Sequence, residues 1–176
     1  MDFSKELIID VLTDSFLENK SVNFIIKKDK NKRKRVEALM QYSYKYANAY
    51  GKVYQHTTQP AFGLLIGTSK KKNTLKSIFW DLKFIFKCVG FKNFNNVVKR
   101  EKILQSKLPK EKIYHLWFVG VSKDLQENGI GSELIQQILL DCKDAPLCLE
   151  TSMPKNFPFY EKLGFECYQE MNDLGY

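Results

Sequence analysis

Residues 119–135, VGVSKDLQENGIGSELI, join the end of an apolar segment to the start of an amphipathic helix through a turn that contains two glycines. Gly129 and Gly131 stand where the helix should begin, so backbone N–H groups and the positive end of the helix dipole would point at one spot. Glycine suits such a place because a Cβ would hold phosphate oxygens away from the main chain. The stretch therefore predicts an anion-binding turn between a strand and a helix.

Two widespread phosphate motifs do not fit this turn. A Walker loop needs a lysine directly before Ser132, where Gly131 stands instead. A dinucleotide fingerprint needs glycines in G-x-G-x-x-G order, and only G-I-G is present. Two glycines at a helix start are also compatible with a plain turn, so the surrounding sequence has to decide.

The last third of the chain alternates strand and helix. IYHLWFVGV (113–121) predicts a strand, SELIQQILLDC (132–142) a helix and APLCLET (145–151) a second strand. Because such a crossover is right-handed, the two strands should be parallel and adjacent or nearly so. A short helix around NFPFYEKLG (156–164) and a closing strand FECYQEM (165–171) should follow.

The first third is mostly helical by its apolar spacing. SKELIIDVLTDSFLEN (4–19) predicts an amphipathic helix capped by Ser4. A second helix is expected over KRKRVEALMQYSYKYANAY (32–50), with Gly51 as its stop.

The middle of the chain changes period twice. GKVYQHT (51–57) and AFGLLIGT (61–68) predict two strands joined by a turn. A helical insertion is expected over residues 70–107, broken at Gly90. Its aromatic residues could form a ligand lid, but helical core with one open edge is the commoner use of such a stripe. These aromatic residues are Phe79, Trp80, Phe84, Phe86, Phe91 and Phe94.

Composition favours one globular domain over residues 1–176, since 44% of the residues are hydrophobic and neither repeats nor a linker interrupt the chain. The four cysteines and two histidines have no CxxC or CxxH spacing, so we expect reduced, buried thiols and no metal. MDFSKELIIDVL lacks the features of a signal peptide, and no apolar run is long enough to span a membrane. We expect a soluble, cytoplasmic protein, a monomer or homodimer, with no membrane partner.

The formal net charge of +8 predicts attraction to anions, which could be nucleic acid, an anionic membrane surface or a phosphate-bearing cofactor. The basic run KKDKNKRKR (27–35) has few interleaved aromatic residues and falls at a turn and helix start. A solvated surface explains such a run, so nucleic acid is an unlikely partner.

Two motifs together resemble the GNAT family of acetyl-CoA-dependent N-acetyltransferases. QENGIG (126–131) is similar to the family's Q/R-x-x-G-x-G/A element and lies, as there, between a strand and an amphipathic helix. LETSMPKNFPFYEKLGFECY (149–168) is similar to its closing element of strand, asparagine, aromatic-Tyr pair and L-G-F. The resemblance covers residues 113–170, the expected acetyl-CoA-binding core. It covers residues 1–110, the mostly helical part with the insertion, only in outline.

This resemblance implies an α/β (α+β) fold. The expected sheet is mixed, mostly antiparallel and twisted, with about six strands, helices on both faces and a helical insertion before the fourth strand. It also implies acetyl transfer from acetyl-CoA to a primary amine by direct attack in a ternary complex. None of the cysteines lies in a nucleophile motif, which favours the direct route. Whether the family's first strand exists stays open, because MDFSKELII reads equally as helix.

The resemblance further implies where acetyl-CoA would bind. The main chain of Val119, Gly120 and Val121 would pair with the pantetheine arm, and Gly120 would leave a surface free of side chains for close approach. Asn156 would hydrogen-bond the same arm. The pyrophosphate would lie on the amides of Gln126, Glu127, Asn128, Gly129, Ile130, Gly131 and Ser132.

Acetyl transfer needs a base, an oxyanion site and a proton donor for the leaving thiolate. Tyr160 is the expected donor, although a plain core aromatic is the alternative. Some protein-acetylating members carry a glutamate base at the position of Trp117, which cannot accept a proton. His115 and Glu150 are therefore the candidate bases, although a structural role is the more common one for each.

A non-catalytic acyl-CoA-binding or nucleic-acid-binding module on the same fold is the rival hypothesis. The acceptor amine is not identified by the sequence. The positive surface disfavours polycationic acceptors unless the cleft is locally acidic, which Glu150 and Glu161 could make it.

Overall fold

A computed structural model describes residues 2–67, 75–109 and 111–171. Within these residues it contains one four-stranded sheet of order β1-β2-β3-β4. The β1–β2 and β2–β3 pairs are antiparallel and the β3–β4 pair is parallel, so the expected mixed sheet and parallel crossover are confirmed. The strands are β1 (Gly51–Gln55), β2 (Ala61–Gly67), β3 (Tyr114–Val121) and β4 (Leu147–Leu149).

Seven α-helices are found in the described residues, and all the predicted ones are among them. Ser4 caps the first as expected, its Oγ accepting from the N–H of Leu7. The second helix was not predicted, because it is only six residues long; Asn19 caps it by accepting from Val22 N–H. The helices are α1 (Lys5–Phe16), α2 (Lys20–Ile25), α3 (Lys32–Tyr50), α4 (Leu75–Phe84), α5 (Phe94–Lys107), α6 (Ile130–Asp141) and α7 (Phe157–Lys162).

Gly51 ends α3 as predicted, but steric crowding explains the glycine better than a left-handed cap does. Its φ of −151° is an extended conformation, and it is the first residue of β1. A Cβ there would stand 1.8 Å from the carbonyl oxygen of Leu65 on the neighbouring strand. The close approach of β2 therefore requires the glycine.

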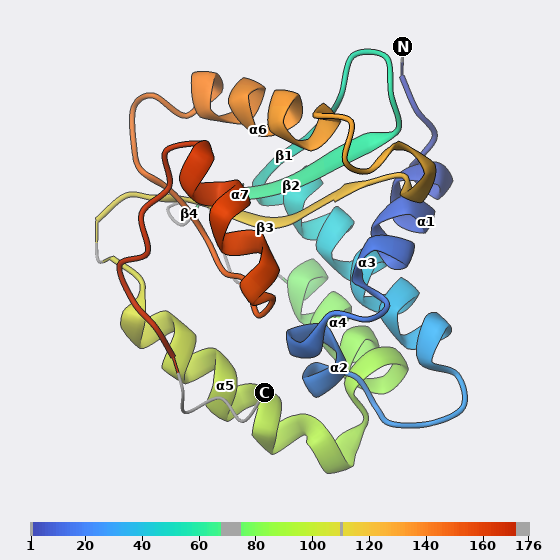
Figure 1. Cartoon of the computed structure of the whole chain (residues 1–176). Helices are drawn as coiled ribbons and strands as arrows, with labels where there is room; N and C mark the ends of the chain where they lie inside the picture. The colour runs from blue at the N-terminus through green and yellow to red at the C-terminus, as the bar shows by residue number, and fades with distance from the viewer. Residues whose placement is uncertain (1, 68–74, 110, 172–176) are drawn as a thin grey trace.

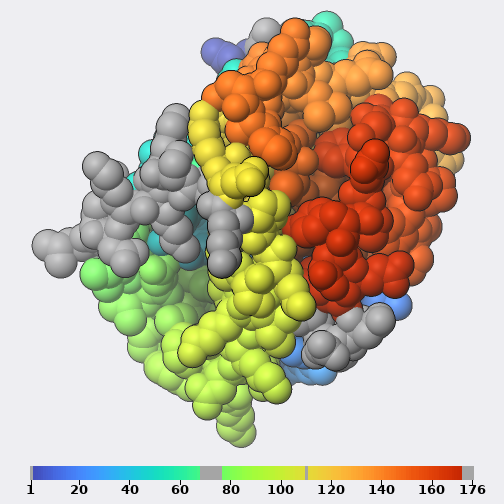
Figure 2. All heavy atoms as spheres, turned by 90° about the vertical axis from the view of Figure 1, so that its left-hand side faces the viewer, coloured from blue at the N-terminus to red at the C-terminus, as the bar shows by residue number. Residues whose placement is uncertain are grey.

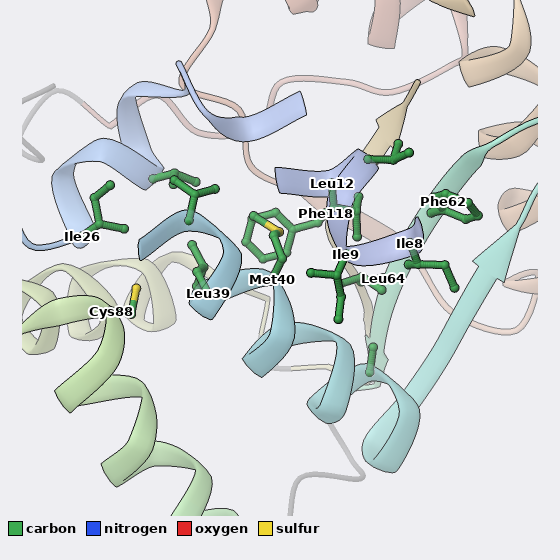
Figure 3. Close-up of a cluster of buried hydrophobic side chains, with 14 of the residues drawn as sticks. Ile8, Ile9, Leu12, Ile26, Leu39, Met40, Phe62, Leu64, Cys88 and Phe118 are labelled. Atoms are coloured by element: carbon green, nitrogen blue, oxygen red, sulfur yellow. The ribbon is translucent and has the colours of Figure 1, made fainter. Parts of the chain in front are cut away.

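Helices cover both faces of the sheet, as expected. In Figure 1, α6 lies across one face, and α1 and α3 lie against the other. Leu12 of α1, Met40 of α3 and Phe118 of β3 point into a common core on the second face (Figure 3). On the α6 side the buried residues are Tyr54, Ala61, Leu65, Leu116, Ile130, Leu134, Ile135, Ile138 and Cys142.

The prediction of about six strands was wrong. Residues 165–171 do not form the expected closing strand, and α1 begins at Lys5 in place of a first strand. Residues 165–171 would have to pair with β4, which has only three residues. Instead, residues 165–171 run beside α5 (Figures 1 and 2).

The helical insertion is confirmed over its described part, while residues 70–74 lie outside the described residues. The break falls at Gly90, whose φ of 71° interrupts the helical path after a π-helical turn, Ile85–Val89. Cys88 and Val89 turn into the core, but most of the aromatic stripe does not. The helical-core interpretation of that stripe was therefore only partly right: Trp80 and Phe84 are half-buried, whereas Phe79, Phe86, Phe91 and Phe94 are exposed.

Candidate active site

The pairing of β3 with β4 ends at the third of the eight residues of β3. Their last paired residues are Leu116 and Leu149, whereas β3 remains paired with β2 as far as Val121. At the same point the β2–β3 register skips Trp117, which forms a β-bulge. Among the described residues, β3 beyond Leu116 thus has no strand partner on the β4 side, although the Val121 carbonyl accepts side-chain hydrogen bonds from Ser15 and Gln126. Bulges of this kind are frequent beside active sites.

A cavity of about 1210 Å³ opens beside this separation. It is bounded by α5 and α2, by the ends of β3 and β4, and by α7 with residues 164–171. Figure 2 shows α5 next to the C-terminal segment, far apart in sequence but side by side in space. The candidate residues that line the cavity are His115, Glu150, Tyr160 and Glu161.

The turn at residues 126–132 has the geometry expected of an anion site. Glu127 and Gly129 have positive φ values of 67° and 81°, and Gly129 directly precedes α6. Within the described chain, the amides of residues 127 to 132 have no hydrogen-bond acceptor, whereas the next amide, that of Glu133, bonds to the Gly129 carbonyl. Successive free amides in such a turn form a concave site for anions. Gln126 contributes a side-chain bond, donating from Nε2 to the carbonyl of Val121 at 3.2 Å.

Gly131 and Gly120 are glycines for different reasons. A Cβ on Gly131 would stand 3.5 Å from Val121 Cγ2 and 3.7 Å from Phe159 Cζ, in the gap between β3 and α7. A Cβ on Gly120 would stand 2.6 Å from Ser15 Oγ, on the α1 face. The expectation that Gly120 leaves a surface free for the cofactor was therefore wrong on the side where a Cβ would stand, because α1 covers that side. The main chain of Gly120 remains a candidate for pairing with the cofactor.

Tyr160 lies on α7, lines the cavity and packs between two rings. Its ring centroid is 5.1 Å from that of Phe159 and 5.7 Å from that of Phe165, both in edge contacts. Burial raises the pKa of Tyr160 to about 12, so the phenol keeps its proton at neutral pH. Nearby, Asn156 Nδ2 donates to Thr151 Oγ1 at 3.4 Å.

His115 and Glu150 come together at the end of the β3–β4 pairing. His115 Nε2 is 3.7 Å from Glu150 Oε1, too long for a direct hydrogen bond. On the other side Arg100 Nη2 is 3.7 Å from Glu150 Oε2 and donates to Ser21 Oγ at 2.6 Å. The structure therefore forms a three-member charge cluster in the wall of the cavity.

Burial dominates the titration of this cluster. It raises the pKa of Glu150, an effect that Arg100 opposes and Glu101 reinforces. Burial also lowers the pKa of His115 to about 4; Glu101 opposes this shift and Arg100 adds to it. Both shifts favour the uncharged forms, as expected for groups withdrawn from water.

The depressed pKa of His115 predicts a loss of stability in mild acid. An unfolded chain takes up a proton on this imidazole near pH 6.5, whereas the folded chain does so only near 4, so stability falls as the pH drops through that window. We expect a loss on the order of 1 kcal/mol at pH 5, because the raised pKa of Glu150 acts in the opposite direction as the pH falls. Urea unfolding at neutral pH and at pH 5 measures it. Equal losses in wild type and His115→Gln would contradict the prediction.

Two groups of site residues were not predicted from the sequence. Arg100 is buried within the apolar stripe of α5, between Val97 and Leu104, and an arginine at that spacing was the available signal. Asp81 lines the same cavity and accepts hydrogen bonds from Tyr42 and Tyr46. Nothing in the local sequence around Asp81 marked it, because its partners lie on another helix.

Comparison with known proteins agrees with this geometry. Residues 83–167 match the family model of the acetyltransferase (GNAT) domain. The fold is similar to the crystal structure of histone acetyltransferase HPA2 and related acetyltransferase from Corynebacterium glutamicum, with a TM-score of 0.62 and 17% identity. That match covers 98% of this chain and 88% of the other. Residues 83–167 thus carry the match to a GNAT acetyltransferase domain, as the two sequence motifs indicated.

Proposed function

We propose that the chain transfers an acetyl group from acetyl-CoA to a primary amine by direct attack in a ternary complex. One observation carries the proposal: the free amides at the start of α6 lie close to the part of β3 that has no strand partner on the β4 side, since a Cβ on Gly131 would stand 3.5 Å from Val121 Cγ2. A pyrophosphate bound at the start of α6 would accept hydrogen bonds from its free amides. An extended pantetheine arm along β3 would take the place of the missing neighbouring strand. We further propose that residues 1–176 act as one domain.

Each step of the reaction has a candidate group. Val119, Gly120 and Val121 would pair with the arm, and Asn156 would hold it from α7. The acceptor amine would attack the thioester carbonyl, and the Tyr160 hydroxyl would protonate the departing thiolate. Its buried, protonated phenol supports that role.

Glu150 is the better supported base of the two candidates. Its raised pKa brings the carboxylate closer to the range in which a base works at neutral pH. The His115 imidazole is also unprotonated at neutral pH, but its pKa of about 4 makes it a weak proton acceptor. We therefore assign proton uptake to Glu150 and a positioning role to His115.

Release of free CoA thiol in the presence of a panel of primary amines tests the function. We expect acetyl-CoA-dependent thiol release with at least one amine and formation of the matching acetylated product. Acetyl-CoA binding without turnover across small amines and peptide amines would favour the non-catalytic rival.

Salt dependence separates the acetyltransferase from the nucleic-acid rival. Acetyl-CoA would contact the protein through only a few phosphates, so we expect a modest loss of its affinity as the salt concentration rises. A polymer contacting many phosphates would lose orders of magnitude over the same range. Filter binding with duplex and single-stranded probes is the measurement. Tight retention that falls steeply with salt would contradict the proposal.

The four cysteines are unpaired in the structure, which supports a reducing, cytoplasmic setting. Within the described chain, none of the helices has the length and apolar character needed to cross a membrane.

A further inference from the structure

A carboxylate and several aromatic rings meet in the wall of the cavity. Asp81 Oδ1 accepts hydrogen bonds from the hydroxyls of Tyr42 at 2.7 Å and Tyr46 at 2.8 Å. The Tyr42 ring stacks 4.4 Å from that of Phe84 and lies 6.0 Å, edge-on, from that of Trp117. All five residues line the cavity.

The hydroxyls of Tyr42 and Tyr46 keep their protons at neutral pH and therefore remain hydrogen-bond donors to Asp81. Burial, and then the hydrogen bond to Asp81, raise the pKa of Tyr42 well above its usual range and that of Tyr46 to about 12. Asp81 has no basic nitrogen within 4.0 Å among the described residues. A half-buried carboxylate held by neutral donors and bordered by rings is a suitable partner for a cation.

The other charged residues that line the cavity are also mostly negative. Arg100 is the single lysine or arginine among the described residues that line it, although the chain contains 28 such residues. The other acidic residues of the lining are Glu101, Glu150, Glu161, Glu166 and Glu170. The described lining of the cavity is thus mainly acidic although the chain as a whole is basic, and such a lining attracts cationic rather than anionic small molecules.

We propose that Asp81, Tyr42, Tyr46 and Trp117 bind a protonated nitrogen of the acceptor, so that the acceptor is an amine with a second, cationic group. The second group remains protonated at Asp81, while a neutral primary amine reaches the thioester. This inference rests on the proposed function for its catalytic meaning, but the binding subsite can be tested alone.

Calorimetry with cadaverine and with the uncharged pentanediol of the same length tests the subsite in the protein without added CoA. We expect wild type to bind cadaverine at least about tenfold more tightly than the diol. The Asp81→Asn substitution should reduce the affinity for cadaverine to that for the diol. Glu170→Gln, which removes an exposed charge from the same lining, should retain most of the affinity.

Three outcomes would overturn the subsite: equal binding of diamine and diol by wild type, unchanged cadaverine binding in Asp81→Asn, or an equal loss in Glu170→Gln. If Asp81→Asn does not fold, the wild-type comparison decides. Acetyl-CoA titration of the same samples reports on the proposed function separately, because a protein that binds cadaverine but not acetyl-CoA would refute only that function.

A second, independent observation concerns the outer face of the insertion. Six large apolar side chains of the insertion, which we call the aromatic face, are exposed to solvent, and one of them, Phe94, also lines the cavity. Exposed fractions are 49% for Ile78, 65% for Phe79, 51% for Leu82, 61% for Phe86, 71% for Phe91 and 39% for Phe94. Phe86 and Phe91 are in ring contact, with centroids 4.9 Å apart, and exposed apolar side chains gathered on one segment in this way mark an interaction surface.

The charges around the aromatic face are positive. Lys83, Lys87 and Lys92 are exposed on the same segment, and no carboxylate of the described chain pairs with them. Burial, with the neighbouring charges of Lys83 and Lys87, lowers the pKa of Lys45 beside them. Two copies of this face would repel each other, so a second copy is disfavoured as its partner.

We infer that the aromatic face docks on an anionic membrane surface, with its phenylalanines at the headgroup boundary and its lysines on the lipid charges. Apolar residues on one helix face with lysines beside them are the usual composition of helices that lie on membranes. This differs from the expectation of no membrane partner, which rested on the lack of a spanning segment.

Co-sedimentation with vesicles of phosphatidylserine and phosphatidylcholine tests this docking. We expect retention on the mixed vesicles, little on phosphatidylcholine alone, and at least a tenfold loss in the double variant Phe79→Ser, Phe86→Ser. Leu140→Ser is the matched control, since Leu140 is 62% exposed but lies on α6. No retention by wild type, an equal loss in the control, or a dimer in sedimentation that the double variant abolishes would overturn the inference.

Discussion

Replacing Tyr160 by phenylalanine should reduce kcat by roughly 10²- to 10⁴-fold while leaving folding and acetyl-CoA affinity nearly intact. The substitution removes the hydroxyl but keeps the ring that packs on Phe159 and Phe165. Because the buried phenol holds its proton with a pKa of about 12, the variant loses the group proposed to protonate the thiolate. The measurement is kcat in a steady-state assay beside acetyl-CoA affinity by calorimetry.

Tyr44→Phe is the matched control, since Tyr44 packs on the α1–α3 core outside the cavity. It should change kcat little. If acetyl-CoA affinity collapses in Tyr160→Phe while kcat survives, Tyr160 is a packing residue and another group is the acid.

Replacing Gly131 by valine should weaken acetyl-CoA binding at least tenfold, equivalent to about 1.4 kcal/mol. The new side chain would begin 3.5 Å from Val121 Cγ2 and 3.7 Å from Phe159 Cζ, so its methyl groups would fill the gap between β3 and α7. They would also stand beside the free amides at the start of α6, where the pyrophosphate is proposed to bind.

Gly131→Ala provides the comparison, because its single methyl group meets only ordinary van der Waals contacts. We expect a smaller loss of affinity and little change in stability from it. Unchanged acetyl-CoA affinity in a folded Gly131→Val protein would exclude the phosphate-binding role of this turn.

The local elements that were predicted correctly share a strong local signal. The three-and-four spacing of α1, α3 and α6 and the capping Ser4 follow from a few neighbouring residues. The turn at residues 126–132 was also predictable, because its glycines act through their own backbone. The closing strand was not, since the pattern in residues 165–171 suits a strand only if a partner is in reach.

The acidic interior could not be read from composition. A chain with a formal charge of +8 gives no sign that, among the residues that the structure describes, only one lysine or arginine lines the cavity, because that separation depends on which face of each helix turns inward. Similarly, Asp81 and its two tyrosines are 35 and 39 residues apart and meet only when α3 packs on α4.

The sequence by itself determined the strand, turn and helix that hold the proposed phosphate site, because backbone conformation there depends on nearby residues alone. Only the tertiary structure decided where β3 separates from β4, why Gly120 is a glycine, and that Arg100, His115 and Glu150 meet. These features arise from contacts between segments far apart in the chain, and spacing along a sequence carries no measure of such distances.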